Sequence, residues 1–314
     1  MLSGEPADEA ATTWPSVTVV IPTRDRPGLL RETLASIRDH DYPGELRSIV
    51  VFDQSEVDDG VAGDKPGREV VAVPNRRTPG AAGARNTGIL AAESELVAFC
   101  DDTDLWLPGK LRAQVEVLRA EPDAEFVTCG LRLFGDTLSS DRSLKLRQVS
   151  RADLLRGHMA QLHPSGFLAR RAAVVDGFGL FDETIPGSYG EDYELLLRAA
   201  ARSPIRNLRS VGVAIRWHKQ SYFGFVKNAP TISAAAQWLL RRYPELSAAG
   251  YAHWAGKVAF AEAARGARGP ALRWAGRAML RRPGDPRAAL AIMVALGVPA
   301  DFVMRQLDRV GHGI

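Results

Sequence analysis

The fold class is decided by residues 17–37, VTVVIPTRDRPGLLRETLASI. Residues 17–21 are apolar or β-branched, which predicts a buried strand that Pro22 ends. Asp25 is the expected N-cap of a following helix, with Pro27 in its first turn. Side chains at helical spacing predict the buried face of this helix: Leu29, Leu30, Thr33, Leu34 and Ile37.

This strand-then-helix pattern repeats along the first hundred residues. Further strands are expected at 48–52, 70–73 and 96–100, with a short helix at 83–92. Apolar strands that alternate with helices are typical of a mostly parallel sheet with helices on both faces. We therefore expect a Rossmann-like α/β fold, in which ligands bind at the carboxyl ends of the strands.

Polar side chains follow each of these expected strands. They are Thr23, Arg24, Asp53, Asn75, Arg76, Asp101, Asp102 and Asp104, and they should line one crevice. Three of them crowd into residues 99–106, FCDDTDLW. Carboxylates this close repel one another unless a cation or hydrogen-bond donors compensate, so a positive partner is expected there.

The common nucleotide-binding motifs do not fit this chain. The first strand leads into PTRDRP instead of a G-x-G-x-x-G turn, and GAAGARNTG at residues 80–88 has the wrong spacing and position for that motif. No G-x-x-x-x-G-K-[ST] sequence is present. Ordinary dinucleotide and ATP sites are therefore disfavoured.

The second half of the chain is expected to be mixed and then helical. The expected elements are a helix at 111–118, a strand at 125–129, a polar connection at 135–150, a strand, short helix and turn within 163–183, a helix at 193–201 after Gly190-Glu191-Asp192, and a strand at 211–217. From about residue 230 the sequence is rich in Ala, Leu and Arg with helical periodicity, which predicts a small helical bundle.

Composition narrows the class of protein. The chain has 314 residues, 46% of them hydrophobic, and its 40 Lys and Arg against 37 Asp and Glu give +3, which implies no general attraction to nucleic acid. Cys100 and Cys129 lie in apolar surroundings and are expected to be buried thiols. Residues 1–15 read as a disordered leader without a signal peptide, and the apolar run 288–298 is shorter than the roughly 20 residues of a membrane span. A cytoplasmic protein is expected.

Taken in order, six segments resemble the family 2 inverting glycosyltransferases of the GT-A fold. They are VTVVIPTRDRPGLLRETLASI, IVVFDQS, GAAGARNTG, FCDDTDLWLPGKL, GFGLFDE and GEDYELLLRAA. The resemblance runs from about residue 16 to 220. It implies a GT-A domain at 16–228, with a nucleotide-binding half at 16–104 and an acceptor half at 105–228, followed by a C-terminal helical region at 229–314.

The resemblance also implies which residues bind the donor and the metal. The matching positions for the nucleotide donor are Pro22, Thr23, Arg24, Asp53, Arg85, Asn86, Asp101 and Asp102. Those for Mn²⁺ or Mg²⁺ are Asp102, Asp104 and His218. Thr103 stands where the family's D-x-D-D run has a carboxylate, and a hydroxyl is a weaker ligand for a hard cation. We therefore favour Asp104, helped by Asp102, over a site that works without metal.

The matching Glu191-Asp192 pair implies the catalytic residues. Asp192 is the expected base that takes the proton of an acceptor hydroxyl, and Glu191 positions Asp192 or the acceptor. The implied reaction is a single displacement with inversion from a nucleotide sugar, with a UDP-sugar favoured. A divalent cation stabilises the diphosphate leaving group.

Plainer interpretations remain open for several of these residues. Asp104 is also compatible with a helix cap, Glu191-Asp192 with first-turn acids, and Arg85-Asn86 with a brace on a helix. His158 and His163 are left as structural residues, and Trp106 as core. The C-terminal helices are expected to pack on their own domain or form a homodimer, in preference to lying on an anionic membrane. Two other activities stay open: a sugar-1-phosphate nucleotidyltransferase, and a catalytically silent sugar-nucleotide binder or scaffold.

Overall fold

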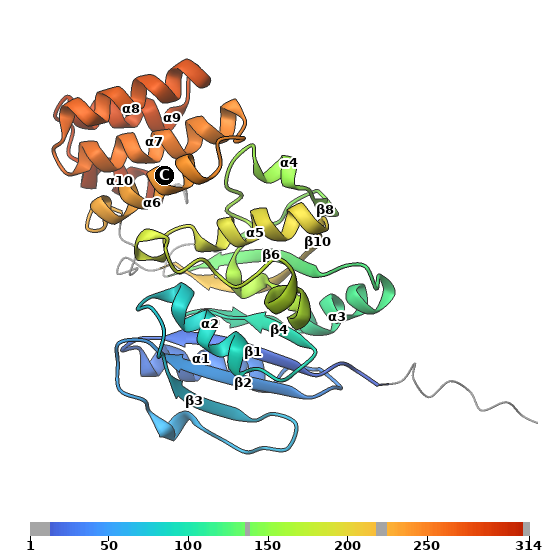
Figure 1. Ribbon diagram of the computed structural model, residues 1–314. Helices are drawn as coiled ribbons and strands as arrows, with labels where there is room; N and C mark the ends of the chain where they lie inside the picture. Colours follow the sequence, from blue (N-terminus) through green and yellow to red (C-terminus); the bar gives the residue numbers. More distant parts are fainter. Residues whose placement is uncertain (1–12, 136–138, 218–224, 310–314) are drawn as a thin grey trace, which may run out of the picture.

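The computed structural model describes residues 13–135, 139–217 and 225–309 (Figure 1). Its centre is a twisted sheet with the strand order β3-β2-β1-β4-β9-β6-β10-β5, with β7 beside β6 and β8 beside β10. The strands are β1 (Val17–Thr23), β2 (Leu46–Phe52), β3 (Val70–Pro74), β4 (Leu96–Phe99), β5 (Leu105–Trp106), β6 (Phe126–Phe134), β7 (Ser139–Arg142), β8 (Gln148–Val149), β9 (Leu168–Arg170) and β10 (Ile205–Arg216).

The sheet is mixed. Strands β3, β2, β1 and β4 are parallel, as expected from their continuous apolar sequence. Strand β9 runs antiparallel to both of its neighbours, β4 and β6, whereas β10 is parallel to β6. The first four strands therefore end together at one edge, and β9 brings the segment that precedes it to the same edge.

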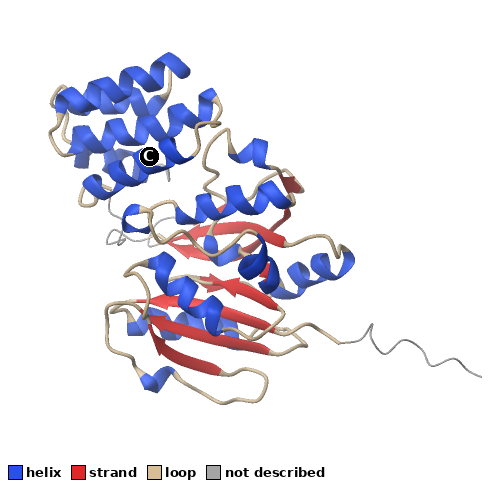
Figure 2. Ribbon diagram, viewed as in Figure 1, coloured by secondary structure: helices blue, strands red, loops and turns tan. Residues whose placement is uncertain are grey.

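Helices cover both faces of the sheet (Figure 2). They are α1 (Pro27–Arg38), α2 (Ala81–Ala91), α3 (Lys110–Ala120), α4 (Arg151–Leu154) and α5 (Glu191–Arg202). Alternate residues of β1 face opposite layers. Val17 and Val19 belong to the cluster that contains Leu30 of α1 and Leu111 of α3, while Val20 belongs to the cluster that contains α2 and α5.

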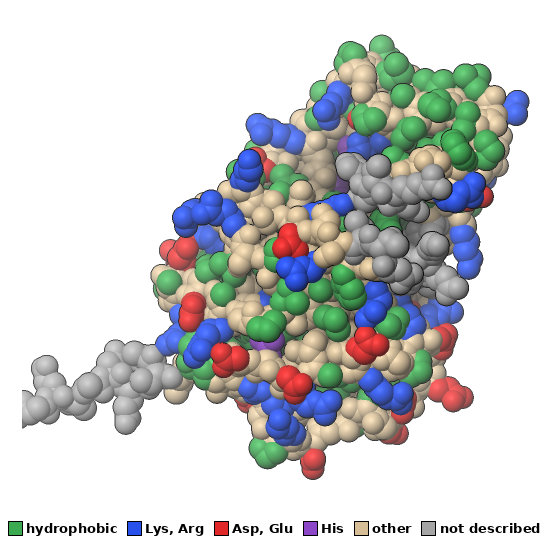
Figure 3. All heavy atoms as spheres, turned by 180° about the vertical axis from the view of Figure 1, so that it is seen from behind, with side chains coloured by type: hydrophobic (Ala, Val, Ile, Leu, Met, Phe, Trp, Pro, Cys, Tyr) green, Lys and Arg blue, Asp and Glu red, His purple; other side chains and the backbone are tan. Residues whose placement is uncertain are grey.

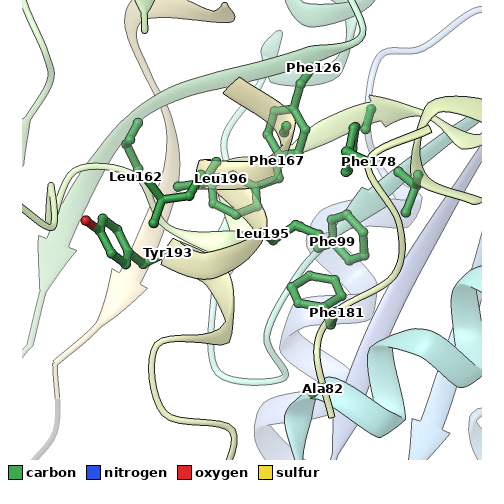
Figure 4. Packing of buried hydrophobic residues seen from close by; sticks show 14 of the residues in the cluster. Ala82, Phe99, Phe126, Leu162, Phe167, Phe178, Phe181, Tyr193, Leu195 and Leu196 are labelled. Carbon is green, nitrogen blue, oxygen red and sulfur yellow. The ribbon is translucent and has the colours of Figure 1, made fainter. Parts of the chain in front are cut away.

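The layer of α2 and α5 is packed with aromatic side chains (Figure 4). The rings of Phe99 and Phe181 lie 5.4 Å apart, and those of Phe126 and Phe167 lie 5.1 Å apart, both edge to face. Leu195 of α5 is fully buried in the same cluster. This packing fixes α5, and with it the Glu191-Asp192 pair at its first turn, over β4 and β9.

Helix α2 approaches β1 closely because of Gly88. A Cβ atom at this position would lie 2.3 Å from Val20 Cγ1, which no side chain can tolerate without movement. The glycine-rich segment 80–88 therefore has a packing role: it lowers α2 onto the sheet.

The C-terminal helices are α6 (Ala229–Arg242), α7 (Ala248–Ala264), α8 (Arg268–Arg281), α9 (Pro286–Ala295) and α10 (Ala300–Arg309). The first two pack on the α/β domain, as expected. Tyr243 donates a hydrogen bond of 2.6 Å to Glu194 of α5, Lys257 of α7 donates one of 2.9 Å to Tyr189, and the rings of Trp254 and Tyr193 lie 5.2 Å apart.

The outer helices expose apolar side chains, which are visible over this region in Figure 3. The large ones are Leu272, Met279, Leu280, Met293, Leu296 and Phe302. Among the described residues, no helix combines the length and the apolar character needed to cross a membrane.

Several local expectations differ from the structure. Asp25 does not cap α1: it has a φ of 53°, and the N-cap is Arg26, without a side-chain hydrogen bond. The left-handed turn at Asp25 instead directs Arg26 toward Asp102, with 2.9 Å between Nη2 and Oδ1. Helix α5 begins at Glu191 and β10 at Ile205, both earlier than expected. Of the expected leader, 1–12 lie outside the described residues, whereas Trp14 packs on Tyr42 with ring centroids 5.5 Å apart.

Candidate functional site

The polar residues at the ends of β1 and β4 meet, as expected for neighbouring parallel strands. Thr23 Oγ1 donates a hydrogen bond of 2.7 Å to Asp102, whose other oxygen is 2.9 Å from Arg26. Burial raises the pKa of Asp102 to about 6, although Arg26 and Thr23 act in the opposite direction. The Asp102 side chain is 1% exposed, and its carboxylate already forms an ion pair with Arg26.

A second group of three residues has ligand atoms that all lie within 4.8 Å of one another: Asp101, Asp104 and His163. His163 Nδ1 lies 3.6 Å from Asp104 Oδ2, and His163 Nε2 lies 3.9 Å from Asp101 Oδ2. Burial raises the pKa of Asp104 to about 6; His163 opposes this shift and the Asp101 carboxylate adds to it. Two carboxylates and an imidazole in one place form a ligand set that suits a divalent cation such as Mn²⁺.

Ser165 holds this group in place. Its hydroxyl donates a 2.6 Å hydrogen bond to Asp104 and accepts one of 3.0 Å from the backbone N–H of Asp101. Asp104 does not cap the next helix, because α3 begins at Lys110 after an N-cap at Gly109. The plain interpretation of Asp104 as a helix cap is therefore wrong.

Arg85 of α2 connects this group to α5. Its Nη2 lies 2.8 Å from Asp101 Oδ1 and its Nη1 lies 2.5 Å from Glu191 Oε1. Arg85 is 3% exposed. Burial acts to lower the pKa of Arg85, but the two acids outweigh it, so the guanidinium stays charged. Arg85 therefore bridges the acids that follow β4 and the first turn of α5.

Glu191 and Asp192 have different surroundings. Burial raises the pKa of Glu191 to about 7; Arg85 opposes this and Asp192 adds to it. Asp192 is half-buried and accepts a 2.8 Å hydrogen bond from the backbone N–H of Tyr193. Asp192 is the more accessible carboxylate of the pair, and Glu191 is the one held by an arginine.

Two other expected donor residues have structural partners. Asp53 accepts hydrogen bonds from Asn75 (2.8 Å) and from the backbone N–H of Gly80 (3.0 Å), which hold the ends of β2 and β3 to the start of α2. Asn86 bonds to both backbone groups of Phe181 and to Glu183. Asn86 thus braces the 181–183 segment.

The remaining predicted residues fall around this centre. Pro22 and Arg24 flank Thr23 at the end of β1. Thr103 donates a hydrogen bond of 3.2 Å to Asp104. Trp106 is buried, and its indole N–H donates to the carbonyl of Ser165, so it is part of the wall beneath the site. His218 lies outside the described residues.

Three residues of this site were not expected from the sequence: His163, Ser165 and Arg26. The sequence predicts only a structural role for His163, but the structure places it against Asp101 and Asp104. No spacing signal links 163–165 to 101–104; the antiparallel pairing of β9 with β4 brings them together. For Arg26, the arginine-rich loop after β1 was the available signal.

Comparison with known proteins gives a family match and several relatives. Residues 18–178 match the model of glycosyl transferase family 2. The chain is 28% identical over 242 residues to the pre-mycofactocin glycosyltransferase of Mycobacterium tuberculosis, which covers 74% of this chain and 49% of that protein. It is 38% identical over 101 residues to the succinoglycan biosynthesis protein ExoW of Rhizobium meliloti, covering 30% of this chain and 31% of ExoW. The chain thus spans half or less of these two relatives.

Two solved structures share the fold. The first is S. aureus TarS residues 1–349 in complex with UDP-GlcNAc, with a TM-score of 0.57 and 16% identity, covering 95% of this chain and 92% of that one. The second is the mannosyltransferase PcManGT from Pyrobaculum calidifontis in complex with GDP-Man and Mn²⁺, with a TM-score of 0.56 and 20% identity, covering 95% and 89%. The expected GT-A architecture with a C-terminal helical region is confirmed.

Proposed function

Because the chain belongs to glycosyl transferase family 2 and is a glycosyltransferase, we propose that it moves a sugar from a nucleotide donor to an acceptor hydroxyl with inversion at the anomeric carbon. The observation that supports this is the arrangement around Arg85. One acidic group, at Asp101 and Asp104, and a second one, at Glu191 and Asp192, lie on the two sides of a single buried guanidinium.

The donor occupies the carboxyl ends of β1, β2 and β4 in this proposal. Thr23, Arg24 and Asp53 lie at this edge, next to Asp101 and Asp102, and Pro22 is the last but one residue of β1. Arg85 and Asn86 fix the wall of the site through their bonds to Glu191 and the 181–183 segment. A UDP-sugar is the donor we favour, as the resemblance in sequence suggests. TarS and PcManGT were solved with UDP-GlcNAc and GDP-Man, respectively.

A divalent cation fits the group of Asp101, Asp104 and His163. The fit rests on three convergent ligand atoms within 4.8 Å and on the hard oxygen and imidazole nitrogen donors, which suit Mn²⁺ and, for the carboxylates, Mg²⁺. When bound, such a cation supplies Lewis-acid stabilisation of the diphosphate leaving group. In this proposal Asp102, which is bound by Thr23 and Arg26, lies next to the group of Asp101, Asp104 and His163 and is not itself a ligand of the cation. His218 stays a ligand predicted from the sequence alone.

Asp192 is the proposed base. The acceptor oxygen forms a bond to the anomeric carbon while the bond to the diphosphate oxygen breaks, and the hydroxyl proton passes to the Asp192 carboxylate. The nucleoside diphosphate leaves with the electron pair of the broken bond. Glu191, tied to Arg85 at 2.5 Å, orients the first turn of α5 so that Asp192 faces the acceptor. A positioned carboxylate base contributes about 10²–10⁴-fold.

The test is a panel of UDP-, GDP- and dTDP-sugars, with nucleotide release measured with and without EDTA. We expect one nucleotide class to support release, EDTA to abolish it, and added Mn²⁺ or Mg²⁺ to restore it. If nucleotide is released at the full rate in EDTA, the proposal that a metal ion is needed is wrong. If none of the nucleotide sugars binds in the presence of Mn²⁺, the proposed sugar transfer from a nucleotide donor is wrong.

A further inference from the structure

A cavity of about 470 Å³ lies between the α/β domain and the helical region. Its volume falls in the range of about 300–1,000 Å³ typical of small-molecule sites. The domain contributes the loop after α4, and the helical region contributes α7 and the segment around α9. Its charged and titratable lining residues are Asp153, Arg156, His158, His253, Arg282 and Arg287.

The cavity carries a surplus of positive charge. Three arginines face one aspartate, and Asp153 is already engaged in the capping box of α4 and lies 3.7 Å from Arg156. Among the described residues, the ion pair that Arg287 makes is a long contact of 3.8 Å with Asp285, which itself caps α9. Within the described ranges, Arg282 has no acidic side chain within ion-pair distance. Arginines grouped in this way recognise phosphate through paired N–H donors.

Two buried nitrogen atoms at this cavity lack partners. His253 is 8% exposed, and its Nε2 forms no hydrogen bond to the described part of the chain. Arg287 Nε is likewise buried without an acceptor. Buried polar atoms in proteins are almost always paired, so a polar ligand or ordered water belongs beside them.

His158 joins the cavity to the proposed base. It lines the cavity, and its ring lies 5.9 Å from that of Tyr193, the residue that follows Asp192. The cavity therefore adjoins the first turn of α5, which carries Asp192.

We propose that this cavity binds a phosphate group carried by the acceptor, so that the acceptor hydroxyl is presented to Asp192. The assignment of the phosphate to the acceptor rests on the proposed function, whereas the anion site itself does not. A phosphate group offers three acceptor oxygens that point in different directions, whereas a carboxylate offers two in one plane. Arginines that converge on one cavity from two separate parts of the chain, Arg156 on one side and Arg282 with Arg287 on the other, therefore favour phosphate.

The experiment uses the full chain with UDP and Mn²⁺ added to fill the donor site. Hexyl phosphate is then titrated while the ring ¹H–¹³C signals of His158 and His253 are followed. The pocket variant is R156S/R282S, since both side chains are exposed and their loss leaves the core intact. The matched control is R273S/R277S, which removes two exposed arginines of α8 that do not line the cavity. Anionic phosphatidylglycerol vesicles form a separate arm.

We expect saturable shifts of both histidines, at least about tenfold weaker binding in the pocket variant, and unchanged binding in the control. Absence of saturable shifts, or equal weakening in both variants, would overturn the proposal. Binding to vesicles without binding to hexyl phosphate would also overturn it, since the arginines would then serve a membrane surface. Nucleotide release from the donor without acceptor should be equal in both variants. Saturable binding in a protein that transfers no sugar would keep the anion site and reject the proposed function.

Discussion

Arg85 of α2 donates a hydrogen bond of 2.5 Å to Glu191 of α5, which lies 106 residues further along the chain. Both side chains are buried. The same guanidinium holds Asp101 at 2.8 Å. One side chain therefore sets the spacing between the proposed metal group and the helix that carries the proposed base. A lysine carries a single ammonium group in place of this planar fork, so we expect a lysine here to lose part of the bridge.

Replacing Arg85 with Met should destabilise the protein by about 3–5 kcal/mol, because two acids, one of them fully buried, lose their cation. Chemical denaturation measures this loss. R202M is the control, since Arg202 pairs with Glu125 at the surface and its removal should change the unfolding free energy little. The R85K variant should still fold, but its rate of nucleotide release should be lower than that of the wild type. Wild-type stability in R85M would show that the bridge is dispensable.

Asp192→Asn should lower kcat by about 10²–10⁴-fold while donor binding stays unchanged, because only proton removal from the acceptor is lost. Steady-state nucleotide release and donor titration separate these quantities. D176N, at an exposed aspartate of residues 173–177, should behave as wild type. Undiminished transfer in D192N would remove Asp192 as the base.

Measuring Mn²⁺ binding in the presence of UDP should show whether Asp104 with His163, or instead Asp102, binds the cation. D104N and H163N should each weaken Mn²⁺ binding by at least about tenfold, since a ligand matters at least as much as the partners that support it. D102N, whose carboxylate is held by Thr23 and Arg26, should weaken binding less. The reverse ranking would make Asp102, which the sequence suggested as a helper of Asp104, the main metal ligand.

His40 should make stability depend on pH. It is 6% exposed, its Nε2 accepts a hydrogen bond from the backbone N–H of Leu111, and burial together with Lys110 lowers its pKa to about 4. The folded state thus favours neutral His40. Its contribution is complete above the unfolded-state pKa of about 6.5 and is lost as pH falls toward 4, by roughly 3 kcal/mol. Unfolding curves of wild type and H40Q between pH 7 and 4 should diverge by this amount; parallel curves would reject this assignment.

Gly88→Ala should destabilise the fold by about 1–3 kcal/mol, because the new Cβ would meet Val20 Cγ1 at 2.3 Å. Gly276→Ala in α8 is the matched control: nothing lies within 4 Å of its Cβ position, so better helix propensity should raise stability by up to about 1 kcal/mol. Thermal unfolding of both variants checks the contrast. Equal effects would mean that α2 can move away from β1.

The sequence by itself determined the elements that depend on local pattern. Continuous apolar runs gave the parallel strands β1 to β4, helical periodicity gave α1 and the C-terminal helices, and the order of motifs gave the family. Polar residues at strand ends were placed correctly at one edge, because parallel strands that are neighbours must end together. Asp101 and Asp104 were found in this way.

The tertiary structure alone decided which of these residues meet. His163 and Ser165 join Asp101 and Asp104 only because β9 inserts antiparallel beside β4, a long-range pairing that leaves no periodic signal in the sequence. Arg85 reaches Glu191 because Gly88 lets α2 lie close to the sheet while an aromatic core fixes α5. The cavity near the first turn of α5 arises where the helical region packs against the α/β domain. Such contacts depend on distances between segments about a hundred residues apart, which local physical preferences do not specify.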